Sequence, residues 1–426
     1  MKGIDLVAVF GHDEKMMFQK LKGMVDLFPP ESEKWFFYQK KICHYLEQCG
    51  FQFIETPCLE KTELFARSTG KDTEVVQKQM YSFLDKNEES ITLRPEATAS
   101  VVRSYIENKI YGAKSVQKYF YFGPLFRYER PQKGRQRQFF QYGVEVLGTE
   151  DPLADAEVIQ VFSDLYTLLE IPFKLLINSL GGRESRSAYL KKLSAYLEKY
   201  ENELDPESKG RLKTNPLRCF DSKVEATQKI MKTAPRILDF LGAEDQKHFE
   251  KVQEYLKMAH VSYEMDSTIV RGLDYYTRTS FEFVGEGLGA KDAICGGGRY
   301  DNLVATLGGP ATPAIGCAAG MERLMLLAKD PHKELEGVFI VGLGGEAKEH
   351  TLKIASSLRT RGVRTLFSFD DKSFKSQLRA ADKENVRYAL ILGENELRNK
   401  KVLVKDMKES VQEEIGLDSV EAYFNI

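Results

Sequence analysis

Apolar side chains first recur every three or four positions near the start of the chain, at Tyr38, Ile42, Tyr45 and Cys49. This spacing predicts a helix with one buried face, and Gly50 can end it. Residues 51–55 are then predicted to be extended, and Pro57 is expected to stop this segment. A second helix is predicted over residues 95–108, because a proline suits a first helical turn.

Residues 115–148 change to a period of two, which predicts a β-hairpin. On the first arm Arg127 and Glu129 share a face, opposite Phe126 and Tyr128. On the second arm one face carries Gln141, Gly143 and Glu145, and the other carries Tyr142, Val144 and Val146. The connecting loop is basic and contains proline and glycine: Arg130, Pro131, Lys133, Gly134, Arg135 and Arg137.

Helical spacing returns in the charged stretch 182–259, at Tyr189, Leu193, Tyr196, Leu197 and Tyr200. We interpret this stretch as a helical insertion. Residues 269–320 are strand-like and rich in glycine, and a helix is predicted after them, over residues 321–328. The polar residues 329–336 are predicted to form a linker.

The last part of the chain alternates strand and helix patterns. Extended segments are predicted at residues 338–341, 365–369 and 388–392, and helices at 347–360 and 372–383. Such alternation is typical of an α/β domain with a largely parallel sheet. A length of 426 residues also favours two or three domains. The expected boundaries are 1–182 with 260–328 for the main domain, 183–259 for the insertion, 329–336 for the linker and 337–426 for the last domain.

Composition narrows the function classes. The formal net charge of -2 gives no general attraction to nucleic acid, so RNA binding would need local basic patches. The six cysteines show neither a C-x-x-C pair nor metal-ligand spacing, so reduced thiols and no structural metal site are expected. The first residues do not form a signal sequence, and no stretch is long enough to span a membrane. We expect a soluble, cytoplasmic protein.

The predicted hairpin carries the strongest chemical signal. Arg127 could form paired hydrogen bonds with a nucleotide phosphate, and the mobile basic loop could reach a second polyanion. The spacing alone is equally compatible with a solvated hairpin that has a charged tip.

A resemblance decides between these interpretations. The string FRYERPQKGRQRQF, residues 126–139, resembles the second motif of class II aminoacyl-tRNA synthetases in its histidyl form. The resemblance implies that Arg127 binds the α-phosphate of ATP, that Glu129 lies near the adenine, and that Gln141 and Glu145 bind substrate histidine. Phe140 is a departure, because many relatives carry histidine there.

Four further strings resemble motifs of the same family, although each alone also has a purely structural interpretation. RGLDYYTRTSFEF, residues 271–283, resembles the first histidine-specific motif and implies that Arg271 holds the substrate carboxylate and α-phosphate and that Tyr276 meets the imidazole. CGGGRYDNL, residues 295–303, is predicted to form a strand-to-helix turn and nominates Tyr300 as a pocket wall. AIGCAAGMERLML, residues 314–326, nominates Arg323 for ATP. TLRPEATAS, residues 92–100, nominates Glu96 and Thr98 for the α-ammonium group.

The histidyl-tRNA synthetase family implies an α+β catalytic domain, built on an antiparallel sheet flanked by helices, with a helical insertion and a C-terminal α/β anticodon-binding domain. It implies ATP with Mg²⁺ as substrate, histidine and its tRNA as partners, and a homodimer formed by residues 35–57. Activation needs positioning and charge neutralisation rather than a protein nucleophile. No Walker A sequence is present. The basic hairpin loop (Lys133, Arg135 and Arg137) is expected to bind the tRNA.

A basic stripe is predicted in the last domain, at Lys372, Lys375, Arg379 and Lys383. These residues would follow one face of a helix and dock the anticodon stem, while Phe374, Leu378 and Ala381 face the core. A solvated charged face is the alternative.

Two other functions remain open at this point. One is a non-catalytic regulatory subunit of histidine biosynthesis with the same fold, although such proteins typically lack the C-terminal domain and have eroded motifs. The other is a nicotinamide-dependent dehydrogenase, because Gly342, Gly344 and Ala347 satisfy G-x-G-x-x-A and Asp370 ends the next predicted strand. The acidic Glu346 argues against a pyrophosphate there.

Overall fold

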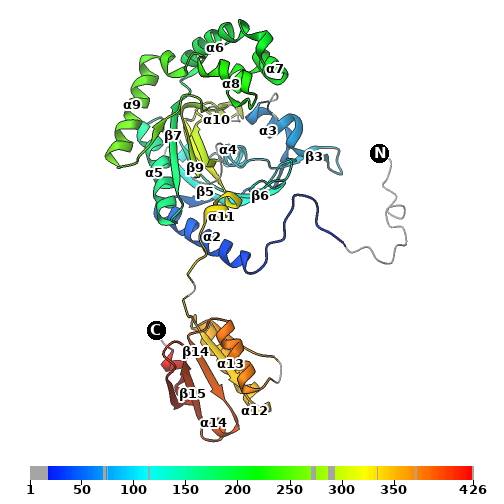
Figure 1. Cartoon of the computed structure of the whole chain (residues 1–426), viewed down its shortest axis with the longest axis vertical. Coiled ribbons are helices and arrows are strands. Elements are labelled where there is room, and N and C mark those ends of the chain that lie inside the picture. The colour runs from blue at the N-terminus through cyan, green and yellow to red at the C-terminus, as the bar shows by residue number, and fades with distance from the viewer. Residues whose placement is uncertain are drawn as a thin grey trace, which may run out of the picture. The chain divides into compact units, whose positions relative to one another are not determined.

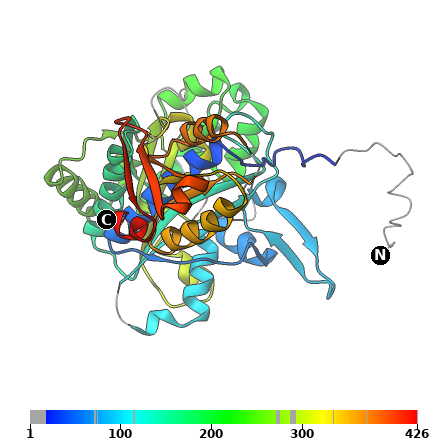
Figure 2. The ribbon, with the colours of Figure 1, turned by 90° about the horizontal axis from the view of Figure 1, so that it is seen from below.

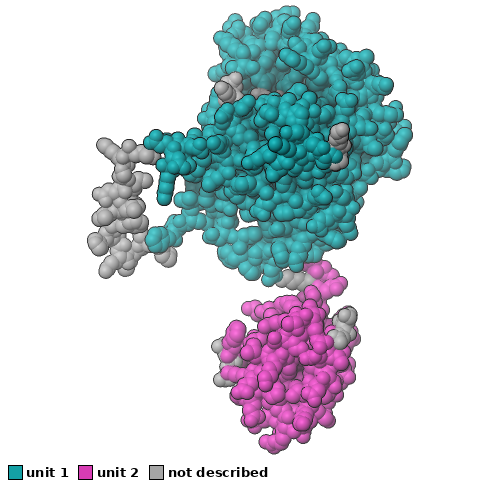
Figure 3. All heavy atoms as spheres, turned by 180° about the vertical axis from the view of Figure 1, so that it is seen from behind, with its two compact units in different colours: residues 1–330 teal, residues 331–426 magenta. Residues whose placement is uncertain are grey.

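A computed structural model describes residues 18–70, 73, 75–113, 116–269, 275–285, 293–332, 334–369 and 372–424. The chain divides into two compact units, residues 1–330 and 331–426, which Figure 3 shows in different colours. No helix in these ranges is long and apolar enough to cross a membrane.

An eight-stranded sheet forms the centre of the first unit (Figure 1). Its pairs are antiparallel except at the two edges, where β1 lies parallel to β5 and β8 lies parallel to β7. The expected antiparallel sheet with flanking helices is therefore confirmed. In spatial order the strands are β1 (Gln52–Phe53), β5 (Gln117–Phe126), β6 (Gln138–Leu147), β11 (Ala314–Gly320), β10 (Ala293–Arg299), β9 (Thr277–Gly285), β7 (Phe173–Ser179) and β8 (Glu264–Met265).

The predicted hairpin is β5 and β6, which pair in register from Gln117 opposite Leu147 to Phe126 opposite Gln138. One detail of the prediction was wrong: β5 ends at Phe126, so Arg127 and Glu129 lie beyond the strand. The cause is local, because the Glu129 N–H donates to the Arg127 carbonyl at 2.8 Å and turns the chain out of the sheet.

The main core lies between this sheet and three helices: α2 (Glu31–Gln48), α5 (Pro152–Leu168) and α9 (Ala243–Met258). The helix predicted from Tyr38 and Ile42 is confirmed as α2, with Leu46 completing its buried face. Gly50 follows it with a φ of 79°, a backbone conformation that glycine adopts without strain. The extended segment predicted after it is short, since only Gln52–Phe53 pairs as a strand.

Near the site the other face of the sheet packs against α4 (Thr98–Glu107) and α10 (Leu303–Thr306), and α3 (Thr62–Thr69) contacts both of these helices. The second predicted helix begins at Thr98 rather than in the turn of Pro95, because the carboxylate of Glu96 accepts the Ala99 N–H at the helix start. A small three-stranded sheet has the order β2 (Leu59–Lys61), β4 (Ser90–Leu93) and β3 (Tyr81–Leu84). Its light-blue hairpin projects from the body of the unit in Figure 2.

The segment predicted to be a helical insertion contains α6 (Arg183–Glu198), α7 (Pro206–Thr214), α8 (Glu225–Lys232) and α9. The first three, which lie together in Figure 1, enclose a small core that includes Tyr189, Leu193 and Leu197. The buried face of α9 instead belongs to the main core. The predicted boundary at residue 259 stays a prediction.

The glycines 296–298 were predicted to form a turn, and this was wrong, because they lie within β10. A β-carbon on Gly297 would lie 2.7 Å from the Phe281 ring, and one on Gly298 would lie 2.6 Å from the Thr279 carbonyl. These glycines therefore allow a tight approach of neighbouring strands rather than forming an anion-binding turn.

The second unit confirms the predicted alternation of strand and helix. Strands β13, β12 and β14 are parallel, and β15 and β16 extend the sheet with antiparallel pairs. Its elements in chain order are β12 (Val338–Gly342), α12 (Gly345–Thr360), β13 (Thr365–Phe367), α13 (Phe374–Lys383), β14 (Tyr388–Leu392), α14 (Glu394–Arg398), β15 (Lys401–Asp406), β16 (Gln412–Gly416) and α15 (Val420–Tyr423).

Candidate active site

Glycines on the central strands make room for two polar side chains in the floor of the candidate site. Glu145 on β6 pairs in register with Gly316 on β11, where a β-carbon would overlap the Glu145 carboxylate and lie 2.6 Å from the Val144 carbonyl. Similarly, a β-carbon on Gly143 would overlap the hydroxyl of Tyr121 on β5. The small residues of this sheet therefore create the space that Glu145 and Tyr121 occupy.

Glu145 is bound by two hydroxyl groups that come from distant parts of the chain. Thr98, at the start of α4, donates to Glu145 Oε1 at 2.7 Å, and Tyr300, after β10, donates to Oε2. All three side chains are buried. Burial raises the pKa of Glu145 to about 8, although both hydroxyl hydrogen bonds lower it. The site thus holds a carboxyl group that can exchange its proton near neutral pH.

Glu96 provides a second buried carboxyl group beside the first. Its Oε1 accepts the Ala99 N–H at 3.0 Å, whereas Oε2 has no hydrogen-bond partner among the described residues. Burial raises its pKa to about 7, against the lowering effects of the Ala99 N–H and the Arg127 charge. The Tyr121 hydroxyl also has no such partner within the described part of the chain. Buried polar atoms without partners are rare and indicate that a ligand or water completes them.

Aromatic rings form one side of this cluster. The rings of Tyr275 and Tyr276 lie 4.7 Å apart, and that of Tyr275 lies 5.7 Å from the Tyr300 ring in an edge-to-face arrangement. Tyr276 is itself buried and directly precedes β9. The predicted histidine-binding residues Thr98, Glu145, Tyr276 and Tyr300 are thus connected through these ring contacts and hydroxyl bonds, and Glu96 lies two residues before Thr98.

Gln141, the remaining predicted histidine-binding residue, lies on β6 between Gly123 of β5 and Gly320 of β11. Its amide makes no hydrogen bond to the residues that the structure describes, so it is available to a substrate. It points along the same strand face as Glu145, as the alternation of side chains in a strand requires.

Arg127 lies where the loop after β5 begins. Its Nε donates to the Pro95 carbonyl at 2.8 Å, and 23% of its side chain is exposed. Burial lowers its pKa, partly offset by the charges of Glu129 and Glu96. Glu129 Oε1 lies 4.0 Å from Arg127 Nη1, and its other oxygen lies 3.7 Å from Arg135 Nη1. The two predicted ATP-binding residues are therefore neighbours, with a cation held beside Glu96.

The loop also lies against α11 (Met321–Leu327), which carries Arg323. A β-carbon on Gly134 would lie 3.1 Å from Leu326 Cδ1 and 3.6 Å from Arg323 Cγ. Arg323 Nη1 donates to the Ala293 carbonyl at the start of β10. This contact brings the third predicted ATP-binding residue to the same loop as Glu129.

The three basic residues predicted to bind tRNA differ in their surroundings. Lys133 and Arg135 are exposed at the loop tip. Arg137 is half-buried, stacks on the Tyr128 ring at 3.8 Å and donates to the Glu129 carbonyl at 3.2 Å. Its backbone N–H donates to the Gly23 carbonyl at 2.7 Å. Arg137 therefore also supports the loop, whereas Lys133 and Arg135 are the residues of this set that are exposed to solvent.

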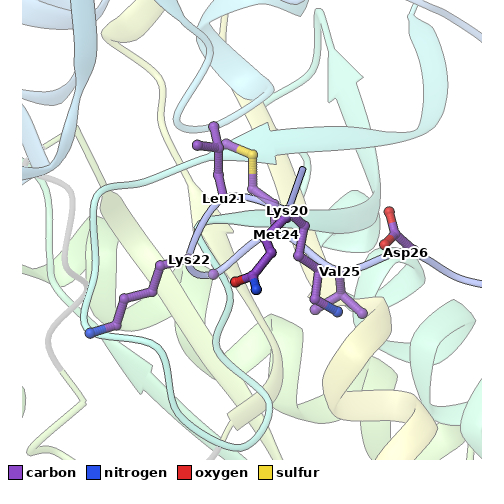
Figure 4. A pocket seen from close by; sticks show the side chains of 8 residues that line it. Lys20, Leu21, Lys22, Met24, Val25 and Asp26 are labelled. Carbon is purple, nitrogen blue, oxygen red and sulfur yellow. The ribbon is translucent and has the colours of Figure 1, made fainter. Parts of the chain in front are cut away.

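The segment that contacts Arg137 forms a shallow pocket of its own, lined by residues 19–26 (Figure 4). Because one short segment lines it and none of the predicted site residues does, we assign it no catalytic role.

Phe140, the departure from the family pattern, is part of an aromatic group with Trp35 at 5.4 Å and Phe122 at 6.2 Å. Its backbone N–H donates to both oxygens of Glu322, at 3.0 and 3.1 Å, and burial raises the pKa of Glu322 to about 7. Sequence reasoning missed Glu322 and Tyr121. The strand period gave a signal for Tyr121, which shares a face with the odd-numbered residues of the hairpin.

Arg271, predicted to be catalytic, lies outside the described residues, as do residues 1–15 and Asp370. Among the described residues no group of three or more histidine, cysteine or acidic side chains could hold a metal ion. The six cysteines are all free thiols.

The basic stripe of the second unit is exposed, but its helix starts later than predicted. Lys372 precedes α13, which begins at Phe374 after a cap by Ser373. Phe374 was expected in the core and is 41% exposed. Gln377 is buried instead, where its amide donates to the carbonyls of Gly342 and Lys372. Leu378 and Ala381 do pack into the core, as predicted.

Comparison with known families follows the same division of the chain. A family model described as histidyl-tRNA synthetase matches residues 23–324, and one described as an anticodon binding domain matches residues 337–425. The chain belongs to the histidyl-tRNA synthetase family. The family expected from the motifs is thereby confirmed.

Similar proteins extend over nearly the full length. The histidine–tRNA ligase of Synechocystis is 44% identical over 406 residues, covering 94% of this chain and 91% of that protein. That of Bacillus licheniformis is 43% identical over 416 residues, covering 95% and 97%. The apo histidyl-tRNA synthetase of S. aureus has a TM-score of 0.81 at 36% identity, covering 96% of this chain and 100% of that one.

The match of residues 337–425 to an anticodon binding domain contradicts the dehydrogenase alternative. The glycines that suggested it have a structural reason. A β-carbon on Gly342 would lie 2.8 Å from Thr351 Oγ1 of α12, so this position allows the strand to approach the helix. Gly344 has a φ of 92°, which starts the turn into α12.

A Bacillus halodurans protein, described as an ATP phosphoribosyltransferase regulatory subunit/histidyl-tRNA synthetase, has a similar structure at 22% identity and a TM-score of 0.64. The two chains overlap over 89% of this one and 99% of that one. At that identity the similarity concerns the fold alone. The non-catalytic alternative is therefore a matter for an activity measurement.

Proposed function

We propose that this chain is an active ATP-dependent histidine–tRNA ligase, which forms histidyl-adenylate and transfers the histidyl group to its tRNA at the cluster around Glu145. The observation that carries this is the meeting of Thr98, Glu145 and Tyr300, with the unpartnered Glu96 oxygen beside them, in a chain of this family. Membership of the family supports histidine ligation, and the class as a whole works through the adenylate.

Neutral imidazole offers one donor and one acceptor. In our proposal Glu145 accepts from one ring nitrogen and the Tyr276 hydroxyl donates to the other. Glu96, Thr98 and Gln141 bind the α-ammonium end, and the Tyr300 hydroxyl holds Glu145 in place through its hydrogen bond to Oε2. A lookalike amino acid would leave these buried groups unpaired, so the preference for histidine should be on the order of 10⁴-fold.

For activation we assign the α-phosphate to Arg127 together with Arg271. Two cations that converge on one phosphate neutralise the charge that develops as the histidine carboxylate attacks and pyrophosphate leaves. Glu129 and Arg323 are assigned to the adenosine end, which the contact between the hairpin loop and α11 supports. Mg²⁺ would arrive with ATP and be held largely by phosphate oxygens, as is usual for this ion.

Two surfaces are assigned to the tRNA. Lys133, Arg135 and Arg137 would meet the acceptor end, since their loop adjoins the site. Lys372, Lys375, Arg379 and Lys383 would meet the anticodon stem, which their exposure and the anticodon-domain match support. Replacing these four residues by glutamine should weaken tRNA binding. The logarithm of the binding constant should also fall less steeply with the logarithm of the salt concentration, by the equivalent of up to about four phosphate contacts. Lys353→Gln with Lys400→Gln, exposed elsewhere in the same unit, is the control. An unchanged slope in the first variant would leave only a solvated charged face.

We further propose a homodimer built on residues 35–57, and a cytoplasmic location. Large apolar side chains are exposed in this segment, with Phe36 at 54% and Phe53 at 53%. Exposed large apolar side chains of this kind are expected where a second subunit covers them. A monomeric mass by light scattering of an active preparation at micromolar concentration would contradict the dimer.

The decisive test is ATP–pyrophosphate exchange with each of the twenty amino acids. Histidine alone should support exchange. No exchange with any amino acid, in a folded preparation, would favour the non-catalytic alternative. Exchange with a different amino acid would show that the assignment of the Glu145 cluster is wrong.

A further inference from the structure

The start of the helical insertion is hydrogen-bonded to the strand that follows the candidate histidine pocket. Just after β7 and at the start of β9, the Leu180 N–H donates to the Arg278 carbonyl at 2.6 Å, and the Arg278 N–H donates to the Gly181 carbonyl at 3.0 Å. Arg278 has a φ of 43°, which is uncommon for any residue except glycine. The surrounding bonds must therefore hold this conformation, which lies two residues after Tyr276.

Asp245 connects the first and the last helix of the insertion segment at this point. Its Oδ2 accepts from the Gly182 N–H and the Ser185 hydroxyl, each at 2.6 Å, where α6 begins. Its Oδ1 accepts from Arg278 Nε at 3.0 Å. Asp245 itself lies in the first turn of α9, so one buried carboxylate connects α6, α9 and the start of β9.

The first turn of α6 also makes direct contact with the pocket. Arg186 Nη1 donates to the backbone carbonyl of Tyr276 at 2.9 Å. The Tyr276 ring in turn contacts Tyr275, whose ring contacts Tyr300, the donor to Glu145. A continuous set of contacts therefore runs from the insertion to the carboxylate that we assign to the imidazole.

We propose that Arg186 is a positioning residue through which the helical insertion sets the place of the Tyr276 side chain in the histidine pocket. Asp245 and Arg278 fix the base of α6, and Arg186 extends from that base to the Tyr276 carbonyl. This inference rests on the proposed function, since it takes Tyr276 as a histidine-binding residue. Its consequence is that part of the affinity for histidine depends on a helix that contributes no side chain to the substrate.

The test is steady-state ATP–pyrophosphate exchange by full-length variants. Arg186→Met removes the donor and should raise the KM for histidine by roughly five- to tenfold. Substitutions in a network of contacts that couples two sites typically change the coupling by an amount of this size. The kcat and the KM for ATP should change less than about twofold, because the bond from Arg186 goes to the Tyr276 carbonyl and not to a residue that we assign to ATP. Arg186→Lys keeps a cationic donor and should restore most of the affinity.

Arg183→Met is the matched control, because Arg183 lies on the same first turn and is exposed, with no described partner. It should behave as the unmodified chain. A double variant with Tyr276→Phe closes the cycle: if Arg186 acts through the Tyr276 hydroxyl, Arg186→Met should add little further loss in that background.

The outcomes separate the two proposals. An unchanged KM for histidine in Arg186→Met would overturn the inference, as would an equal fall in kcat with a lowered melting temperature, which indicates a purely structural role. If Tyr276→Phe itself leaves the KM for histidine unchanged, the assignment of Tyr276 in the proposed function fails instead. Full additivity of the two substitutions would place the effect of Arg186 elsewhere than Tyr276.

Discussion

Replacing Glu145 by glutamine tests the histidine pocket in two independent ways. The first is the loss of affinity. Glu145 accepts from Thr98 and Tyr300, and in the complex it would also accept the imidazole N–H. A glutamine has one accepting oxygen, and its amide group would face donors. Losing a charge-assisted hydrogen bond costs about 1.5–3 kcal/mol, so the KM for histidine should rise roughly 10- to 100-fold.

The second is the pH dependence. The raised pKa of Glu145, about 8, means that the free site carries a proton at pH 7. Accepting an N–H from neutral imidazole requires the carboxylate, so the proton must leave when histidine binds. One pH unit below the pKa this costs about 1.4 kcal/mol, and the KM should therefore be close to tenfold higher at pH 7 than above pH 8. The glutamine variant has no proton to lose and should not show this change.

The assay is pyrophosphate exchange between pH 7 and pH 8.5, with the KM for histidine measured for both proteins. Their ratio cancels the titration of histidine itself, which is the same in both assays. Glu96, whose charge raises the pKa of Glu145, is tested separately by repeating the comparison in a Glu96→Gln background. We expect the ratio of the unmodified to the variant KM to fall nearly tenfold as the pH rises. Glu129→Gln is the control and should raise the KM for ATP instead. A ratio independent of pH would refute the reasoning, since it would mean that the proton stays in the complex.

Three further changes test other parts of the structure. Asp155→Asn should lower the free energy of unfolding by about 3 kcal/mol or more in urea denaturation, because it leaves the fully buried guanidinium of Arg299 without its main counter-ion. Arg271→His should slow histidyl-adenylate formation by roughly 10²-fold or more with little change in tRNA binding by filter assay. Gly316→Ala should abolish histidine-dependent exchange, since the new methyl group would overlap the Glu145 carboxylate.

Each of these has a contradicting outcome. Asp155→Leu with Arg299→Met removes both charges and should recover part of the lost stability. A double variant as unstable as the single one would show that the unpaired charge of Arg299 is not the main cost, and that the hydrogen bonds from His248 and Thr279 to Asp155 matter more. Normal exchange by the Arg271 variant would mean that this arginine has been misplaced. Full activity of Gly316→Ala would mean that β11 can move away from β6.

Local patterns were sufficient for most elements but not for their ends. The periods of two and of three to four residues predicted the β5–β6 hairpin, α2 and the alternating second unit, because these patterns follow directly from which face is buried. Glycines misled where they serve packing: residues 296–298 were predicted as a turn and lie in β10. Phe374 was predicted to be buried because its spacing fits the core face of α13, but the amide of Gln377 bonds to two carbonyls there.

The candidate site could be nominated from motifs, yet its connections could not. Thr98, Glu145 and Tyr300 come from α4, β6 and the end of β10, and no local pattern indicates that their oxygens meet. The same holds for the bond from Arg186 to the Tyr276 carbonyl, which joins residues from different helical and strand segments. Such contacts depend on the sheet order, and the sheet order places β11 between β6 and β10.

The glycine-lined floor under Glu145 has a consequence for attempts to redesign the amino-acid specificity. In many binding pockets a new substrate is accommodated by enlarging or trimming wall side chains, one position at a time. Here the floor at Gly143 and Gly316 has no side chains to trim, and adding any would collide with Tyr121 or Glu145. A variant that accepts a larger or differently charged amino acid must therefore replace Tyr121 and Glu145 themselves. It must also replace Thr98 and Tyr300, whose hydroxyl groups would lose their acceptor without Glu145. Specificity in this pocket should consequently change through coordinated substitutions, and single-site libraries should yield inactive proteins rather than broadened ones.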